Sequence, residues 1–104
     1  MTHLDDPKQF CQLSPAVRYA LLRWIRNHFA PSRRKMRGGL TSYGLKHEFE
    51  ASGGKHCDYV SNGAYKGAMV AAGYEPINPA AQNWEFRAIY YPEGRPSNEG
   101  DVHK

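Results

Sequence analysis

The stretch LTSYGLKHEFEASGGKHCDYVSNGAYKGAM, residues 40–69, nearly repeats itself after twenty residues. A hydroxyl residue preceded by an apolar residue and followed four positions later by another is typical of a helix N-cap with a hydrophobic staple. Glycines follow both halves, at Gly53 and Gly73, where helices commonly stop. The sequence therefore predicts two short helices of one design, at about 41–51 and 61–72. The matching residues are Leu40, Thr41 and Leu45, then Val60, Ser61 and Tyr65.

A further helix is predicted ahead of this stretch. Ser14 followed by Pro15 fits an N-cap with proline in the first helical position. Apolar residues then recur at helical spacing as far as Ile25, and we expect the helix to span residues 15–29 and to end before Pro31. This helix presents a basic outer surface. The residues on that surface are Tyr19, Arg23, Arg26 and Asn27.

A strand is predicted late in the chain. In NWEFRAIYY, residues 83–91, large apolar side chains alternate with mostly polar ones. Alternation of this kind indicates a half-buried strand. KHCDYV has room for a second short strand at residues 56–60, which could pair with the first as a two-stranded wing. The inward positions of the late strand are Trp84, Phe86, Ala88 and Tyr90.

Together these elements predict a mainly α fold with a short β element (α+β). We expect a single three-helix domain, similar to a helix-turn-helix and with a wing as an option, over residues 13–91. Residues 1–12 would form a polar lead-in and residues 92–104 a disordered tail. Other interpretations stay open, because about eight residues separate the second and third helices, whereas the turn of a DNA-reading helix-turn-helix has three or four. Three-helix units also serve as protein-docking modules.

Length and composition restrict the class of protein. With 104 residues, of which 40% are hydrophobic, the chain is expected to be one folded domain with a modest core. Cys11 and Cys57 show no disulfide-framework spacing and the N-terminus has no apolar signal sequence, so we expect a reduced, cytoplasmic setting. No apolar run approaches the roughly 20 residues of a membrane span, so no membrane contact is expected.

The net charge of +4 is unevenly distributed. Residues 7–47 contain nine Lys or Arg and no Asp or Glu, whereas residues 48–104 contain five basic and eight acidic residues. Such asymmetry favours contact with a polyanion, because Lys and Arg that neutralise phosphates supply most non-specific affinity for nucleic acid. A solvated basic surface that maintains solubility is the alternative.

Candidate binding residues gather around APSRRKMRGGL, residues 30–40, which has four basic residues in five positions, followed by two glycines. This pattern predicts a mobile positive loop that could follow a phosphate backbone. The third helix offers base-reading side chains only at Asn62 and Lys66, and its small residues predict close packing. The lysines at 46 and 66 match in the repeat and are not required by the staple. The candidate residues for binding nucleic acid or a partner are Arg23, Arg26, Arg33, Arg34, Lys35, Arg37, Lys46, Asn62 and Lys66.

Patterns for catalysis and metal binding are weak. His56 and Cys57 are adjacent and would point to opposite faces of a strand, which does not suit a shared metal ion. Cys57 beside His47 or His56 matches no nucleophile motif, and a half-buried Cys in a short strand is the simpler interpretation. Paired carboxylates, GxGxxG and a phosphate loop are all absent from the sequence. We expect a non-enzymatic protein without metal or cofactor.

The segments TSYGLKHEFE and YVSNGAYKGAMVAAGYEP, with the NW that follows, resemble a family of small proteins from phages and integrative elements. The family pattern is close to TSYxLKHxFE followed by YVxNGxxKGAMxxAGY. The resemblance covers residues 41–84, with weaker similarity in WIRNHFAP, and this chain has a longer connection, EASGGKHCD. It implies an accessory gene product of a mobile element and no particular reaction. Similar helical segments occur in some anti-CRISPR proteins.

Two functions follow as expectations. The first is a DNA-binding accessory or regulatory protein that uses the basic loop and helix surface. The second is an anti-CRISPR or other anti-defence inhibitor that docks on a host nucleic-acid-processing protein complex. Because the chain is basic, an inhibitor of this kind would block its target by docking rather than by imitating DNA.

Overall fold

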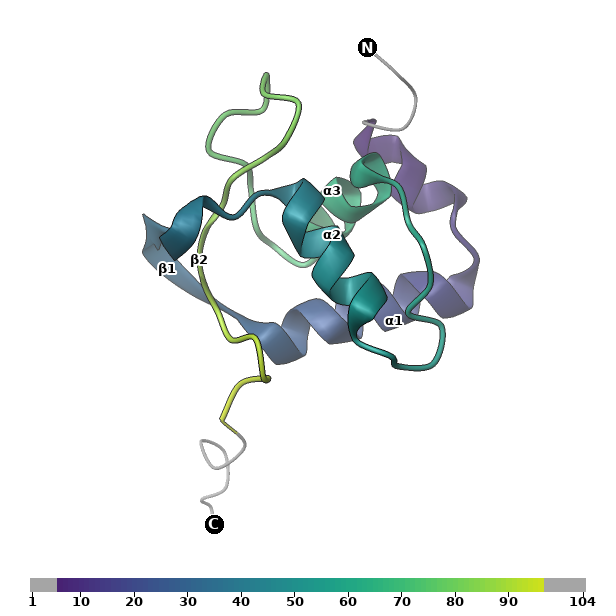
Figure 1. The fold of residues 1–104 in the computed structure, drawn as a ribbon. Helices are drawn as coiled ribbons and strands as arrows, with labels where there is room; N and C mark the ends of the chain where they lie inside the picture. Colours follow the sequence, from purple (N-terminus) through teal and green to yellow (C-terminus); the bar gives the residue numbers. More distant parts are fainter. Residues whose placement is uncertain (1–5, 97–104) are drawn as a thin grey trace.

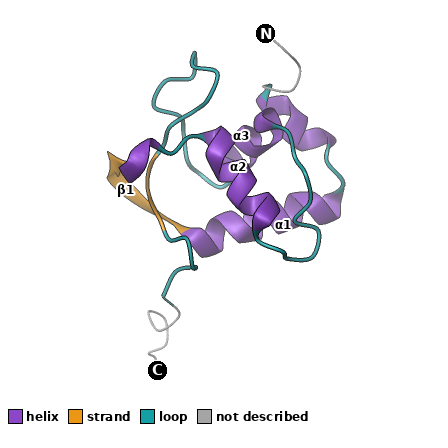
Figure 2. Ribbon diagram, viewed as in Figure 1, coloured by secondary structure: helices purple, strands orange, loops and turns teal. Residues whose placement is uncertain are grey.

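The computed structural model of the 104-residue chain describes residues 6–96. The three α-helices gather on one side of the molecule, and the two strands form a ribbon on the other side (Figures 1 and 2). The described chain is therefore a small α+β domain, as the sequence predicts. In chain order its elements are the 3-10 helix η2 (Pro7–Gln12), α1 (Pro15–His28), β1 (Phe29–Lys35), the 3-10 helix η3 (Arg37–Gly39), α2 (Ser42–Ala51), α3 (Asn62–Ala71) and β2 (Arg87–Tyr90).

The first helix, α1, begins and ends close to the predicted positions. The Ser14 hydroxyl accepts a hydrogen bond from the Val17 N–H at 3.4 Å, and Pro15 occupies the first helical position. The helix ends at His28, one residue earlier than expected, and the chain continues directly into β1. The buried face of α1 consists of Leu21, Trp24 and Ile25.

The core is aromatic, and Trp24 lies at its centre. The Trp24 ring meets the rings of Phe29, Phe49 and Tyr65 edge-on, at centroid distances of 5.9, 5.7 and 6.2 Å. Edge-to-face pairs at this separation add to the energy of burial. These four residues come from α1, β1, α2 and α3, so one cluster holds all the main elements together.

The strand partner that we predicted for β2 is wrong. β2 pairs antiparallel with β1, in a register that sets Phe29 opposite Tyr90. Residues 55–60 form turn and irregular structure instead of a strand. The segment expected to be a mobile loop is therefore a strand over most of its length. Its sequence has no alternating pattern, and its partner lies more than fifty residues away in the chain, so no local signal could indicate the pairing.

The two helices of the repeat form at the expected positions but are capped differently. The Ser61 hydroxyl accepts a hydrogen bond from the Ala64 N–H at 3.0 Å, as predicted. The Thr41 side chain makes no capping bond. Instead, the Ser42 N–H donates to the Trp84 carbonyl at 2.7 Å, and the Ser42 hydroxyl accepts from the Trp84 N–H at 3.0 Å. The start of α2 is thus tied to the chain just ahead of β2.

The helix α3 is the central element of the fold. Seven of its ten residues are buried, and it ends in the left-handed Gly73 (φ 101°) with the Tyr74 N–H bonded to the Met69 carbonyl at 2.9 Å. A recognition helix must expose the side chains that enter a DNA groove. A winged helix-turn-helix is therefore not confirmed, because α3, which would be the recognition helix of such a fold, forms part of the core.

The ends of the predicted domain need correction. Residues 7–12 belong to the domain as η2, which packs on α3 (Figure 1), rather than to a polar lead-in. Close to the other end, the Arg95 N–H donates to the Asn27 carbonyl at 2.7 Å, so the predicted disordered tail is ordered in its first residues. The remaining parts of the lead-in and tail, residues 1–5 and 97–104, lie outside the described residues.

Candidate nucleic-acid interface

Three of the eight predicted basic residues lie on β1, in the ribbon that it forms with β2. Pro31 is opposite Ala88 and Lys35 is opposite Arg87, so the intervening residues of β1 have no partner in the register of the two described strands. This irregularity places Arg33 and Arg34 in a bulge, where both are exposed. Bulges commonly redirect side chains away from a sheet. The Arg34 N–H donates to the Ser32 hydroxyl at 3.1 Å, which fixes the backbone of the bulge.

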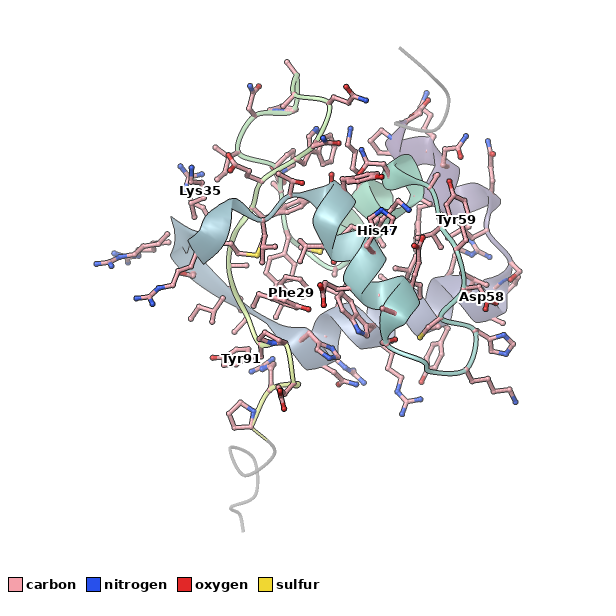
Figure 3. The ribbon with its side chains drawn as sticks, in the orientation of Figure 1. Phe29, Lys35, His47, Asp58, Tyr59 and Tyr91 are labelled. Carbon is pink, nitrogen blue, oxygen red and sulfur yellow. The ribbon has the colours of Figure 1, made fainter. Side chains whose placement is uncertain are left out.

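Three further residues complete what we call the ribbon cluster. Lys35 lies at the outer end of β1 (Figure 3), and Arg37 is exposed in η3. Arg87 on β2 is exposed directly opposite Lys35. One carboxylate, Glu85, lies 3.6 Å from the Lys35 ammonium, and both side chains are partly exposed. The ribbon cluster consists of Arg33, Arg34, Lys35, Arg37 and Arg87.

Sequence reasoning omitted Arg87 from the candidate site. The alternating pattern of residues 83–91 did indicate its outward position, and the structure confirms that position, with Ala88 buried and Arg87 exposed. What the sequence could not show was that the partner strand would be the basic segment. Arg87 belongs to the basic cluster only because β2 pairs with β1, and the sequence does not indicate that pairing.

A groove of about 490 Å³ lies beside the ribbon cluster and is lined by Arg34, Lys35 and Arg37 together with Tyr90. The Tyr90 hydroxyl donates to a Glu48 carboxylate oxygen at 3.5 Å. Burial, with a smaller contribution from the charge and hydrogen bond of Glu48, raises the pKa of Tyr90 to about 12. The phenol is therefore a neutral hydrogen-bond donor at the edge of a positively charged groove.

The structure divides the six exposed candidate cations into two groups. Arg23 and Arg26 lie on α1, where they line a different groove with Tyr74 and Arg95. None of the residues that line this groove also lines the groove beside the ribbon cluster. The predicted surface is thus two basic regions, and the ribbon holds the larger share of the candidate cations.

Lys46 is wrongly predicted as a contact residue. It is only 3% exposed. Its ammonium donates to a Glu50 carboxylate oxygen at 3.0 Å and lies 4.5 Å from the centroid of the Tyr59 ring. The same Glu50 oxygen accepts the Val60 N–H at 2.9 Å. The residue therefore joins α2 to the segment that leads into α3, and it is not available to a phosphate.

Lys66 and Asn62 are also corrected, because both belong to the buried surface of α3. They are 3% and 5% exposed. The Lys66 ammonium lies 4.8 Å from the centroid of the Trp84 ring. The Asn62 amide donates to the Gln82 carbonyl at 3.2 Å and to the Asn83 side chain at 2.9 Å. Both matching lysines of the repeat are thus placed over aromatic rings, an arrangement that favours a buried cation.

Replacing Asn62 with Ala is expected to lower the free energy of unfolding by about 1–3 kcal/mol, since two partly buried hydrogen bonds to the loop ahead of β2 are lost. Affinity for a DNA duplex should not change. Urea unfolding and fluorescence anisotropy measure the two quantities. A loss of DNA affinity without a loss of stability would show that Asn62 is a contact residue after all.

The described residues form neither a metal-binding cluster nor a membrane-spanning helix. Among residues 6–96, no group of three or more His, Cys, Asp or Glu side chains is placed to hold a metal ion. In the same part of the chain, no helix is long and apolar enough to cross a bilayer.

Comparisons of the chain with models of protein families, with curated proteins and with solved structures find no match. The resemblance of residues 41–84 to proteins of phages and integrative elements therefore stays a prediction.

Proposed function

We propose that the protein binds nucleic acid, with DNA as the expected form, through the ribbon cluster, and that it catalyses no reaction. The observation that supports this most is the bulge of β1, where Arg33 and Arg34 lie exposed outside the strand ladder. Cations gathered on one exposed element neutralise phosphates without requiring a base sequence. The expected contact is therefore with the backbone of the duplex.

The cations of the ribbon cluster can contact phosphate groups at little energetic cost. The ion pair between Lys35 and Glu85 spans 3.6 Å at the surface. Exposed pairs of this kind contribute about 0–1 kcal/mol, so a phosphate can replace the carboxylate at little cost. Lys35 and Arg87, opposite each other on the ribbon, repel one another until an anion binds between them.

The biological role proposed for this activity is that of an accessory protein of a phage or other mobile element. This role rests on the resemblance of residues 41–84. Binding to the DNA backbone suits such a protein, because phosphate contacts orient a protein on the duplex without reading the bases. The proposal does not require a helix-turn-helix, since no side chain of α3 takes part in it.

The test is a salt titration of binding to a 20-base-pair duplex, followed by fluorescence anisotropy. The logarithm of the association constant should fall linearly with the logarithm of salt concentration, with a slope of about −0.9 per phosphate neutralised. Replacing Arg33 and Arg34 together with Ala should reduce the magnitude of this slope by about 1.8. Affinity at low salt should fall at the same time.

The matched control is the double replacement of Lys8 and Lys55 with Ala. This variant loses the same two charges from exposed positions outside the ribbon cluster. Its slope should equal that of the unchanged protein. If the two double variants have equal slopes, binding follows net charge rather than the ribbon cluster, and the proposal is wrong.

A second candidate function, docking on a host nucleic-acid-processing protein as an anti-defence inhibitor, is favoured by one observation. Tyr43 and Tyr59 are 50% and 68% exposed, and their ring centroids lie 5.5 and 4.5 Å from the Lys46 ammonium. Exposed tyrosines are enriched at protein interfaces. Figure 3 shows Tyr59 and His47 on the side of the molecule away from Lys35. Co-purification that survives nuclease treatment and is lost when Tyr59 is replaced with Ala would favour this function.

A further inference from the structure

The second basic region is a groove of about 360 Å³ between α1 and the end of α3. Its floor is apolar, and on the α3 side it is lined by Ala71 and Ala72. These short side chains leave the space that a larger residue would fill. On the α1 side, Leu22 and Ile25 complete the floor. The groove is therefore a consequence of small residues at the end of a helix that is otherwise buried.

Three arginines surround this floor. Arg23 and Arg26 lie one turn apart on α1, and Arg95 is brought to the groove by the bond from its N–H to the Asn27 carbonyl. No Asp or Glu is among the described residues that line the groove. The guanidinium groups of Arg23 and Arg26 produce a positive potential over an apolar surface. The complementary ligand is an anion that also carries an apolar body.

Two tyrosines lie at the edge of the same groove. Tyr19 on α1 is largely exposed, and Tyr74 packs on Phe29 with the ring centroids 6.0 Å apart. Burial raises the pKa of Tyr74, although the nearby Arg95 charge opposes the shift. Tyr74 is thus a neutral phenol, able to donate a hydrogen bond. Flat aromatic rings beside an apolar floor suit a ligand whose body is itself a flat ring.

We propose that this groove binds a single nucleotide unit, with its phosphate beside Arg23 and Arg26 and its base on the apolar floor beside Tyr19 and Tyr74. Guanidinium groups bind phosphate through paired hydrogen bonds, and bases stack on aromatic side chains irrespective of sequence. The volume lies at the lower end of the range for small-molecule sites, which suits one nucleotide rather than a longer strand.

The nucleotide can come from two sources: a free mononucleotide, or the unpaired terminal nucleotide of a bound strand. The second source rests on the proposed function, and the first does not. Both require the same groove residues. The experiment therefore tests the groove first and then separates the sources.

The groove is tested by titrating the ¹⁵N-labelled full chain with AMP, ribose 5-phosphate and adenosine. AMP should shift the amide signals of the α1 and α3 segments around the groove in a saturable manner. Ribose 5-phosphate, which lacks the base, and adenosine, which lacks the phosphate, should each bind at least about tenfold more weakly. Equal binding of AMP and ribose 5-phosphate would show a simple charge effect and overturn the proposal.

Three variants locate the ligand. Replacing Arg23 and Arg26 together with Ala removes the phosphate contacts, and Ala71→Leu fills the floor while keeping every charge. If Ala71→Leu does not fold, Tyr19→Ala tests the contact with the base instead, because Tyr19 is largely exposed. Each should weaken AMP binding about tenfold or more, whereas the double replacement of Lys8 and Lys55 should not. AMP binding that survives all three variants would lie elsewhere, and the proposal would be wrong.

The sources are separated by a duplex with a three-nucleotide overhang and a blunt duplex of the same total charge. If strand ends are the source, the overhang is preferred, and Ala71→Leu abolishes the preference while the slope set by Arg33 and Arg34 is unchanged. If free nucleotides are the source, AMP binds and the two duplexes are equal. Without AMP binding and without an overhang preference, the inference fails, whatever the blunt duplex shows about the ribbon cluster.

Discussion

Replacing Gly67 with Ala is expected to lower the free energy of unfolding by about 2–3 kcal/mol, although alanine is the better helix former. A Cβ atom at Gly67 would overlap the carbonyl oxygen of Pro7 and lie 2.6 Å from the Phe10 Cβ. Both obstacles belong to η2, and a backbone carbonyl cannot rotate away as a side-chain end can. The added methyl group can be accommodated only if η2 moves off α3. At Gly63 the same substitution would overlap the backbone of Asp6.

The matched control is Gly44→Ala in α2. A Cβ atom there would meet only the Leu40 Cδ2, at an ordinary 3.9 Å. This variant should gain about 0.5–1 kcal/mol from helix propensity. Urea unfolding compares the two variants, and hydrogen exchange of residues 7–12 reports whether η2 has detached. Equal stabilities for Gly67→Ala and Gly44→Ala would contradict the packing of η2 on α3.

The glycines of α3 show which part of the packing can be predicted from local sequence. The small residues of the third helix predicted close packing, but three surfaces were possible: core, DNA or a partner. The structure identifies the core, because η2 contacts α3. The sequence of residues 7–12 is polar enough to suggest a lead-in, and its docking depends on the absence of side chains at Gly63 and Gly67. The hydrophobic periodicity of residues 7–12 and of α3 does not predict the contact between η2 and α3.

Capping was predictable where it depends on neighbouring residues. Ser14 and Ser61 both accept the hydrogen bonds expected of N-caps, and Gly73 closes α3 in the left-handed conformation. Thr41 occupies an N-cap position without a side-chain bond, because Trp84 supplies partners for the next residue instead. The pairing of β1 with β2 was missed for the same reason. Both depend on segments that are distant in the chain.

The two repeat lysines are predicted as contact residues because they match in the repeat and the staple does not require them. Their positions gave a different signal, since Lys46 lies between Ser42 and Phe49 on the buried stripe of α2. Lys66 occupies the matching place on α3. A cation on an apolar stripe needs partners, and Glu50 could have been recognised at i+4. The rings of Tyr59 and Trp84 near the ammonium groups could not, because the loops that carry them are placed only by the complete fold.

Replacing Glu50 with Ala is expected to cost about 3 kcal/mol, because it leaves the buried Lys46 ammonium without its carboxylate. The Val60 N–H, which donates to the same Glu50 oxygen, would also lose its acceptor. Glu75→Ala, at an exposed position, is the control and should lie within about 0.5 kcal/mol of the unchanged protein. Replacing Lys46 with Met should cost less than Glu50→Ala, since it removes the buried charge itself.

The same carboxylate should make stability depend on pH. Burial alone would raise the pKa of Glu50, but the Val60 N–H, the bond and charge of Lys46 and the charge of His47 together hold it below its ordinary value. Because the folded pKa is the lower one, this contribution is complete above the unfolded pKa and is lost as pH falls through the folded pKa. Glu50→Gln keeps an oxygen acceptor for Val60 but cannot titrate.

Urea unfolding between pH 7 and pH 3 isolates this contribution as the difference between the unchanged protein and Glu50→Gln. The difference should persist while the carboxylate is charged in both states, and should shrink as pH falls below about 4.5. The other carboxylates titrate alike in both proteins and cancel. A difference that stays constant over this range would mean that Glu50 stabilises the fold through its packing and hydrogen bonds alone. The charge of Lys46 would then be balanced by the rings of Tyr43 and Tyr59 rather than by the carboxylate.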